Sequence, residues 1–339
     1  MPRNQQIVLD NRPRGAAVLG NFRLVVADTP ALAEGQVLVR HHYLSLDPYM
    51  RGRMNEGPSY AAAQALGEVM IGGTVGEVVE SRNPQYAVGD KVLGMGGWQE
   101  YSVIDGKAPG ALRKLGAGPF PLSYYLGAVG MPGVTAWYGL VKIIAPKAGD
   151  SVVVSAATGA VGSAFAALAR ARGCRVVGIA GGAEKCRYAV QELGFDACID
   201  HQRYGNEGKA LAQALGQACP QGIDGCFENV GGWILDAVML RMNAFGRIAL
   251  CGLIAGYDGA PQPLSNPALL LVKRMRIEGF IVSEHLEVWP EALKELGALA
   301  GSGRLRPRET IAQGLAAAPE AFLGLLQGRN FGKQLVQLI

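Results

Sequence analysis

The strongest constraint on the fold is an alternation of strand-like and helix-like segments that begins near residue 123. Apolar runs such as SVVVSA, RVVGIA and GRIALCG are separated by segments with helical spacing, among them AVGSAFAALARAR and NEGKALAQALGQA. Strands that alternate with helices favour a parallel sheet with helices on both faces. The second part of the chain is therefore predicted to be a doubly wound α/β domain.

The part of the chain before this alternation has a different pattern. Short segments of alternating polarity at 36–46, 72–81, 90–95 and 98–104 are broken by glycine and proline, which predicts an all-β unit, barrel-like or sandwich-like. A chain of 339 residues is long for one core, so two domains are expected. The closing segment GKQLVQLI is an apolar strand that we expect to return to the N-terminal unit.

Composition excludes several classes of function. The net charge of +4 is small and no run of Lys and Arg indicates nucleic-acid binding. We see no secretory signal and no apolar stretch of about 18 residues that would span a membrane, so a cytoplasmic location is expected. The six cysteines are scattered, which favours free thiols. His41 and His42 are adjacent in a predicted strand and point to opposite faces, so no zinc site is expected.

Residues 155–162 read SAATGAVG and are typical of a phosphate-binding loop. Gly159 and Gly162 have the spacing of the second and third glycines of G-x-G-x-x-G. The second lets backbone approach a pyrophosphate, the third lets helix pack on strand, and the helix N-terminus offers N–H groups. Ala157 replaces the first glycine, which is tolerable if the turn needs no positive φ there. The loop predicts a dinucleotide site, with an ordinary tight turn as the alternative.

The end of the next strand selects the dinucleotide. NAD sites carry an acid about 20 residues after the glycines, where it binds the ribose 2′-hydroxyl. Here Ala180, Gly181 and Gly182 occupy that place, and Lys185 and Arg187 follow at the start of a helix. A cation there can bind a 2′-phosphate, so NADP(H) is the predicted cofactor. The alternative is that both cations are solvated charges on the helix surface.

The order of parts resembles the medium-chain dehydrogenase/reductase superfamily. Within it, motifs over nearly the whole chain are similar to the zinc-independent branch of prostaglandin and leukotriene reductases, alkenal double-bond reductases and curcumin reductases. They are LSLDPYMRGRM, GMPGVTAWYGL, AATGAVGS, FENVGG, GRIALCGLIAGY, EGFIV and GRNFGKQLV. Where zinc-dependent relatives have a Cys ligand and a Gly-His-Glu motif, this chain reads LDPYM and LGEVM. The resemblance therefore implies no metal.

The same resemblance implies the fold. We expect a GroES-like catalytic domain over residues 1–125, completed by 301–339, and a Rossmann NADP-binding domain over 126–300. Relatives also imply a homodimer through the nucleotide domain, with RMRIEGFIV as a pairing edge strand.

Carried over by similarity, the pyrophosphate contacts are Gly159 to Gly162, and Lys185 contacts the 2′-phosphate. Asn229 is expected near the ribose or nicotinamide, although it could instead cap a helix starting near Gly232. Phe280 and Val282 bracket the nicotinamide or are simply core strand residues. His201 stands where relatives have a cofactor-binding Tyr. The full cofactor set is Thr135, Gly159, Ala160, Val161, Gly162, Lys185, His201, Asn229, Cys251, Gly252, Leu253, Ile254, Tyr257, Phe280, Ile281, Val282 and Asn330.

The activity implied is NADPH-dependent reduction of the C=C bond of α,β-unsaturated ketones or aldehydes. Hydride adds to the β-carbon, and the enolate oxygen needs a hydrogen-bond donor. Tyr257 is the first candidate donor, and Tyr49 is the second, as a pocket wall; either could be an ordinary surface or core residue. The expected partner is a small electrophile. Quinone reduction and a non-catalytic, redox-responsive NADPH-binding protein remain alternatives.

Overall fold

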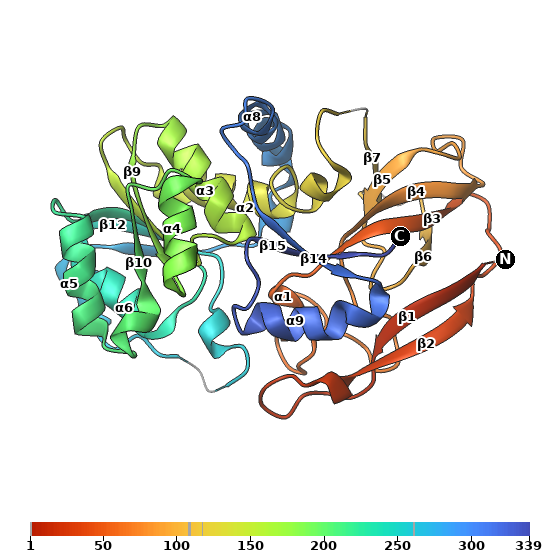
Figure 1. Cartoon of the computed structure of the whole chain (residues 1–339), viewed down its shortest axis with the longest axis horizontal. Helices are drawn as coiled ribbons and strands as arrows, with labels where there is room; N and C mark the ends of the chain where they lie inside the picture. The colour runs from red at the N-terminus through yellow and green to blue at the C-terminus, as the bar shows by residue number, and fades with distance from the viewer. Residues whose placement is uncertain (1, 108–109, 117, 260–261) are drawn as a thin grey trace. The chain divides into compact units, whose positions relative to one another are not determined.

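The computed structural model describes residues 2–107, 110–116, 118–259 and 262–339. The chain divides into two compact units (Figure 1). Unit 1 holds the chain up to Leu126 together with Glu309–Asn330 and Gln334–Ile339. Unit 2 holds Gly127–Arg308 and Phe331–Lys333.

Unit 2 is built on a sheet of six parallel strands in the order β10-β9-β8-β11-β12-β13. Their bounds are β8 Ser151–Ser155, β9 Arg175–Ala180, β10 Ala197–Asp200, β11 Ile223–Glu228, β12 Met242–Leu250 and β13 Arg276–Gly279. Numbered along the chain, this order is 3-2-1-4-5-6, so the connections change direction between β8 and β11. Ligands of such sheets bind outside the carboxyl ends of the strands at this switch point.

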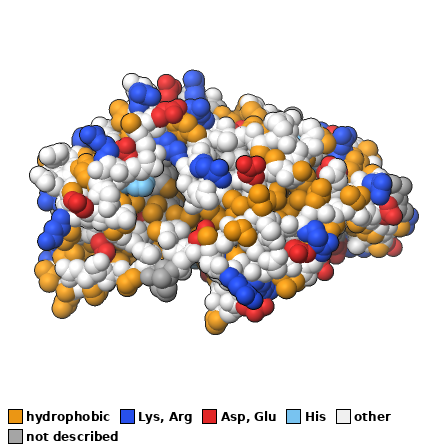
Figure 2. All heavy atoms as spheres, turned by 60° about the horizontal axis from the view of Figure 1, so that its bottom comes forward, with side chains coloured by type: hydrophobic (Ala, Val, Ile, Leu, Met, Phe, Trp, Pro, Cys, Tyr) orange, Lys and Arg blue, Asp and Glu red, His pale blue; other side chains and the backbone are white. Residues whose placement is uncertain are grey.

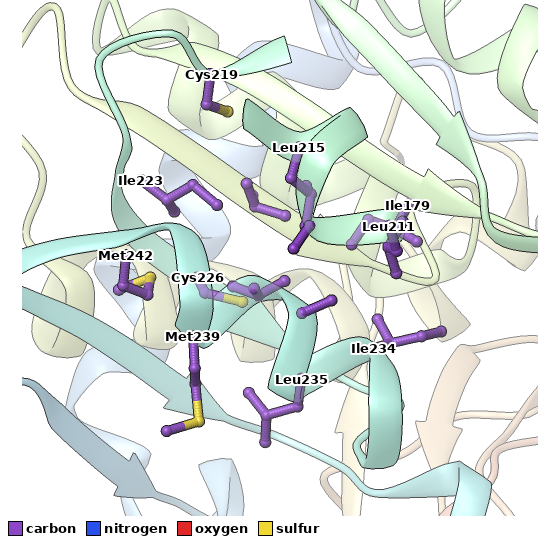
Figure 3. Packing of buried hydrophobic residues seen from close by; sticks show 14 of the residues in the cluster. Ile179, Leu211, Leu215, Cys219, Ile223, Cys226, Ile234, Leu235, Met239 and Met242 are labelled. Carbon is purple, nitrogen blue, oxygen red and sulfur yellow. The ribbon is translucent and has the colours of Figure 1, made fainter. Parts of the chain in front are cut away.

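Helices cover both faces of this sheet, which confirms the predicted doubly wound architecture. On one face, α5 (Gly208–Ala218) and α6 (Gly232–Arg241) close a core that includes Leu211, Leu215, Ile234 and Met239 (Figure 3). On the other face, the Phe165 ring of α3 (Ala160–Ala171) lies 5.3 Å from the Phe227 ring of β11. The remaining helices of unit 2 are α2 Met131–Tyr138, α4 Ala183–Gln191, α7 Ala268–Val272 and α8 Trp289–Gly301.

Unit 1 contains a seven-stranded sheet in the order β14-β15-β3-β4-β5-β7, with β6 paired to β3. The bounds are β3 Gln36–Ser45, β4 Thr74–Ser81, β5 Lys91–Gly94, β6 Tyr101–Asp105, β7 Leu112–Lys114, β14 Glu309–Gln313 and β15 Lys333–Gln337. Strand β15 runs antiparallel to β3, with Leu335 opposite Ser45, so the chain end returns to the N-terminal β unit as predicted.

The core of unit 1 is aromatic. The buried Trp98 ring stacks on Phe22 and meets Phe322 edge-on, with both pairs of ring centroids 5.5 Å apart. Phe322 belongs to α9 (Ala318–Leu326), and a shorter helix, α1, spans Tyr49–Arg53. Short 3-10 segments of unit 1 lie at Leu19–Asn21, Leu122–Leu126 and Leu315–Ala317.

Some local elements differ from the sequence-based expectation. Strands β1 (Arg3–Leu9) and β2 (Phe22–Asp28) form an antiparallel pair that polar residues at the start of β1 concealed. The helix expected over NPALLLVKR is shorter, because Arg274 takes a left-handed φ of 51° just after α7. A π-helix at Gly139–Ile144 follows α2 and ends at Ala145, whose φ is also positive, at 46°.

Neither the surface charge in the view drawn nor the described helices indicate binding to nucleic acid or insertion into a membrane. On the face drawn in Figure 2, basic and acidic side chains are interspersed, and no continuous basic area is seen. Within the described ranges, no helix combines the length and apolar character that crossing a membrane requires.

Candidate functional site

The turn between β8 and α3 is shaped by main-chain crowding. A Cβ on Gly162 would lie 2.5 Å from the carbonyl oxygen of Ala157 and 2.6 Å from that of Ala156, so only glycine fits there. A Cβ on Gly159 would meet the Ala156 oxygen at 3.2 Å, which a small shift can accommodate. The left-handed residue is Ala156, with φ 51°, and Ala157 is not among the residues with positive φ. Ala157 therefore satisfies the condition under which it can replace a glycine.

The N-terminus of α3 has no side-chain cap. Its N-cap is Gly159, which has no side chain to cap the first turn, and the turn carries no acidic residue. Ala160 and Val161 are partly exposed, whereas Gly162 is buried. The first-turn N–H groups of a helix have no partner within the helix, and together with the dipole they favour an anion.

The turn after β9 is held in place by side chains from the end of β10. The N–H of Gly182 donates to Asp200 Oδ1 at 2.8 Å, which ties this turn to the end of β10. A Cβ on Gly181 would lie 3.1 Å from His201 Nε2, so the imidazole lies against this glycine. Burial lowers the pKa of both Lys185 and His201; at His201 the Asp200 carboxylate opposes this change and the Lys185 ammonium adds to it. A half-buried cation and a neutral imidazole therefore share this strand end.

Arg187, the other cation considered from the sequence, differs from Lys185. It is exposed on α4, as expected of a solvated helix charge. Lys185 is partly buried on the same helix, and Gly181 and Gly182 place no carboxylate at the end of β9.

Glu228, which the sequence-based site omits, joins the ends of two strands. It is fully buried, and its Oε1 accepts from Ser155 Oγ at 2.7 Å, from the Val230 N–H at 2.6 Å and from the Gly231 N–H at 2.7 Å. Burial raises the pKa of the Glu228 carboxyl, and these hydrogen bonds oppose that rise. Strand register puts Phe227 opposite Val154, so the next residue of each strand meets its neighbour at the switch point.

Asn229 is held by the same serine. Its backbone N–H donates to Ser155 Oγ and its Nδ2 donates to the Ser155 carbonyl, both at 2.8 Å. Helix α6 has Gly231 as its N-cap, without a side-chain cap. The alternative that Asn229 caps α6 is therefore wrong, because its amide is committed to the end of β8.

Tyr257 lies over the turn that follows β12. The position of a Cβ on Gly252 would be 3.3 Å from Tyr257 Oη and 3.2 Å from the Asn229 carbonyl oxygen. The N–H groups of Cys251 and Gly252 donate to the Glu228 carbonyl oxygen at 2.9 and 3.1 Å. The Tyr257 hydroxyl thus lies beside the carboxyl ends of β11 and β12.

The other residues of that turn are less enclosed. Leu253 is exposed, and Ile254 begins a 3-10 turn, Ile254–Gly256, that leads to Tyr257. The Cys251 thiol is desolvated, and burial raises its pKa to about 12, so it is a neutral thiol in this turn.

The predicted nicotinamide contacts fall on two elements. Thr135 is buried in α2, where its hydroxyl donates to the Met131 carbonyl at 2.8 Å. Phe280 lies just past β13, partly exposed, with its ring stacked 5.2 Å from that of Tyr138. Ile281 is also partly exposed, whereas Val282 is buried. The alternative that Phe280 is a residue of a core strand is therefore wrong, because Phe280 lies after the end of β13 and is partly exposed.

Two predicted site residues belong to unit 1. Tyr49 opens α1, and burial together with the Asp47 carboxylate raises the pKa of its hydroxyl. Asn330 lines a surface pocket with Glu320, Arg329 and Gln334. Among the described residues, no three His, Cys, Asp or Glu side chains are grouped as metal ligands.

Comparison with known proteins gives matches along the chain. Residues 5–112 match a family described as the N-terminal domain of oxidoreductases, and residues 160–298 match one described as zinc-binding dehydrogenase. The NADPH-dependent curcumin reductase of Escherichia coli is 47% identical, covering 99% of this chain and 97% of its own. The NADP(+)-dependent 2-alkenal reductase of Nicotiana tabacum is 40% identical, with 99% and 97% covered.

A solved structure agrees with these relatives. CurA from Vibrio vulnificus, crystallised in complex with NADPH, is 46% identical to this chain, with 99% of each chain covered and a TM-score of 0.91. The GroES-like and Rossmann-type architecture is thereby confirmed. The chain belongs to the medium-chain dehydrogenase/reductase superfamily, in the branch of curcumin, alkenal and prostaglandin reductases, and is an NADPH-dependent oxidoreductase.

Proposed function

We propose that this enzyme reduces the C=C bond of α,β-unsaturated ketones and aldehydes. The relatives named for curcumin and 2-alkenals support the substrate class, since a 2-alkenal carries a C=C bond conjugated to an aldehyde. The observation that carries the proposal is the Tyr257 hydroxyl beside Gly252 and Asn229 at the ends of two sheet strands. Bound NADPH supplies the hydride for the β-carbon.

The residues of unit 2 fit the cofactor. The crowding at Gly162 seats the first turn of α3 directly on the β8 turn, so that N–H groups at 160–162 can hold a pyrophosphate. Lys185 would bind the 2′-phosphate, and the neutral His201 imidazole can donate a hydrogen bond beside it. Gly181 and Gly182 carry no carboxylate of their own, and the Asp200 carboxylate beside them accepts a hydrogen bond from the Gly182 N–H.

The remaining contacts complete the proposed site. Asn229, oriented by Ser155, and the backbone from Cys251 to Ile254 would face the ribose and nicotinamide. Thr135 would bind the carboxamide. Phe280, Ile281 and Val282 would flank the ring, and Asn330 would contact the diphosphate.

Tyr257 would stabilise the charge that the reaction creates. As hydride reaches the β-carbon, negative charge moves to the carbonyl oxygen, and a phenol donates a hydrogen bond to that enolate. A single oxyanion donor is worth roughly 2–4 kcal/mol, or about 30- to 1000-fold in rate. Tyr49, whose raised pKa keeps it protonated, is proposed as a wall of the substrate site.

The decisive experiment compares Tyr257→Phe with the parent on an enone, a 2-alkenal and a benzoquinone. We expect the turnover number on the enone to fall at least about 30-fold with unchanged NADPH affinity, while Tyr204→Phe, whose ring packs against the core under α5 and α6, behaves like the parent. Equal turnover in Tyr257→Phe and parent removes Tyr257 from the mechanism. If NADPH is consumed with the quinone alone, the protein is better described as a quinone reductase. If NADPH is consumed with none of the three electrophiles, a non-catalytic NADPH-binding protein is favoured.

We further propose a homodimer joined through β13, in the cytoplasm. Within the part of the chain that the structure describes, strand β13 pairs only with β12, and the adjacent Leu271 and Val272 are 81% and 65% exposed. An unpaired strand edge next to apolar side chains suits a second copy of the chain. All six cysteines are free, as in a reducing compartment. Light scattering should give twice the chain mass for the parent, and Leu271→Asp should shift it toward the monomer.

A further inference from the structure

Two thiols meet directly behind the residue that would bind the 2′-phosphate. The Cys198 thiol of β10 donates to the Cys186 sulfur of α4 across 3.2 Å. Cys186 lies in the first turn of α4 and follows Lys185 in the chain. Cys186 is 9% exposed and Cys198 is partly exposed, on the edge strand of the sheet.

The neighbouring strand leaves room for this pair. Gly178 of β9 lies opposite Cys198 in the parallel register. A Cβ at Gly178 would lie 3.1 Å from Cys198 Sγ and 2.7 Å from the Cβ of Ala157. The space that Gly178 leaves is thus occupied by a thiol on one side and by the phosphate-loop alanine on the other.

We propose that Cys186 and Cys198 form a reversible disulfide on exposure to a hydroperoxide, and that this bond weakens the binding of NADPH through Lys185. No step of the reductase reaction uses either thiol. The effect on affinity rests on the 2′-phosphate site proposed above, whereas formation of the bond does not.

The chemistry balances as the loss of two electrons from sulfur. Cys186, as the thiolate, attacks one peroxide oxygen, the O–O bond breaks, and water leaves with the thiol proton, which gives a sulfenic acid. The Cys198 sulfur then attacks Cys186 Sγ, the S–O bond breaks, and a second water leaves. Two thiols and one hydrogen peroxide thus give one disulfide and two waters.

Cys186 is the thiol suited to the first attack. The hydrogen bond from the Cys198 thiol lowers the pKa of Cys186, although burial and the Asp200 carboxylate oppose this change, and so favours the Cys186 thiolate. The same hydrogen bond raises the pKa of Cys198, whose proton stays on until the second step.

We infer that closing the bond moves the corner that carries Lys185. A disulfide holds its sulfurs about 2.05 Å apart, so the two sulfurs must approach by about 1 Å from their 3.2 Å contact. Whatever part of this approach the two side chains do not supply by rotation must come from a shift of α4 against β10. The Gly182 N–H at the start of α4 already donates to Asp200 at the end of β10. This hydrogen bond restricts how far the two elements can move independently at this corner. We expect the shift to be passed to Lys185.

The test treats the full-length protein with hydrogen peroxide and measures mass, peptide map and dinucleotide affinity. We expect loss of two hydrogen atoms, a peptide pair joined through Cys186 and Cys198, and NADPH affinity weakened about fivefold or more, with NADH affinity unchanged. Dithiothreitol should restore the original affinity. Absence of the joined peptides, or a disulfide that leaves NADPH affinity unchanged, overturns the proposal.

Matched variants separate this proposal from the proposed function. Cys186→Ser and Cys198→Ser should both keep the reduced protein's affinity and lose its peroxide response, whereas Cys174→Ser, at a buried thiol near the Lys147 carbonyl, should keep the response. Lys185→Ala in the reduced protein tests the 2′-phosphate site independently. If Lys185→Ala lowers NADPH affinity but the disulfide does not, only the redox proposal fails.

Discussion

The turns after β8 and β9 lie at neighbouring strand ends, yet they are built differently. The β8 turn is governed by the main chain: Gly162 is required because a Cβ has no space, and Ala156 takes a left-handed φ. At the β9 turn the side chains of Lys185 and His201 are the groups that we propose contact the cofactor, and burial lowers the pKa of both. A main-chain site cannot distinguish one dinucleotide from another, whereas a charged side chain can. Substitutions in the two turns should therefore differ in kind.

The largest effect is expected from Gly162→Ala. Its Cβ would lie 2.5 Å from the Ala157 oxygen, so α3 and the turn must separate, at a cost of about 1–3 kcal/mol in unfolding free energy. Calorimetric titration should show loss of both NADPH and NADH binding, since both need the same pyrophosphate seat. Gly159→Ala, with a 3.2 Å approach, should keep nearly the parent's melting temperature while it weakens both dinucleotides. Normal binding by Gly162→Ala would contradict the main-chain account of this turn.

The second effect concerns the β9 turn and should be selective. Lys185→Ala removes a charge-assisted contact worth roughly 1.5–3 kcal/mol, so the dissociation constant of NADPH should rise about 10- to 100-fold. The constant for NADH should stay the same, because NADH has no 2′-phosphate. Arg187→Ala, exposed on the same helix, is the matched control and should change neither constant. An equal loss for both dinucleotides in Lys185→Ala would show that Lys185 supports the fold and does not bind the phosphate.

How much of each turn the sequence predicts depends on whether the main chain or the side chains determine it. Glycine spacing reports main-chain crowding directly, so Gly162 could be assigned from the chain alone. The residue with a left-handed backbone could not be assigned from the sequence, because alanine at position 156 gives no signal for a positive φ. Strand alternation likewise predicts the parallel sheet.

Residues whose partners are distant in sequence were missed. Glu228 lies at the end of a predicted strand and was given no role from the sequence, and only the β8–β11 register brings it to Ser155. Cys186 and Cys198 belong to different elements, and their contact depends on Gly178 in a third. A signal was available for Glu228: a carboxylate between a buried apolar strand and a glycine turn is surrounded by N–H donors.

A smaller, pH-dependent effect on the free energy of unfolding is expected at Glu228, which lies beside the turn after β8. Burial raises the carboxyl's pKa above its usual 4.5, so the folded protein binds this proton more tightly than the unfolded chain. The stability it contributes is present at low pH and is lost as pH rises through the raised pKa. Glu228→Gln keeps an oxygen for Ser155 and cannot ionise. Its unfolding free energy relative to the parent should therefore increase, by on the order of 1 kcal/mol, between about pH 4 and pH 8.

Urea unfolding at several pH values measures that difference. Glu184→Gln, an exposed carboxylate on α4, is the control and should show no comparable trend. A difference between Glu228→Gln and parent that stays flat with pH would mean that the carboxyl is not desolvated as the structure shows.

The smallest effect tests the backbone of the first turn itself. Ala156 has φ 51°, a conformation that costs a residue with a Cβ about 1 kcal/mol and glycine nothing. Part of that gain is offset by the greater freedom of glycine in the unfolded chain, so Ala156→Gly should stabilise the protein by about 0.5 kcal/mol. Ala157→Gly is the control one residue away: Ala157 is buried without a positive φ, so it should destabilise. Calorimetric melting temperatures that move in opposite directions would locate the left-handed residue at 156. If they move together, the turn does not have this conformation, and the distinction between main-chain and side-chain sites loses its structural basis.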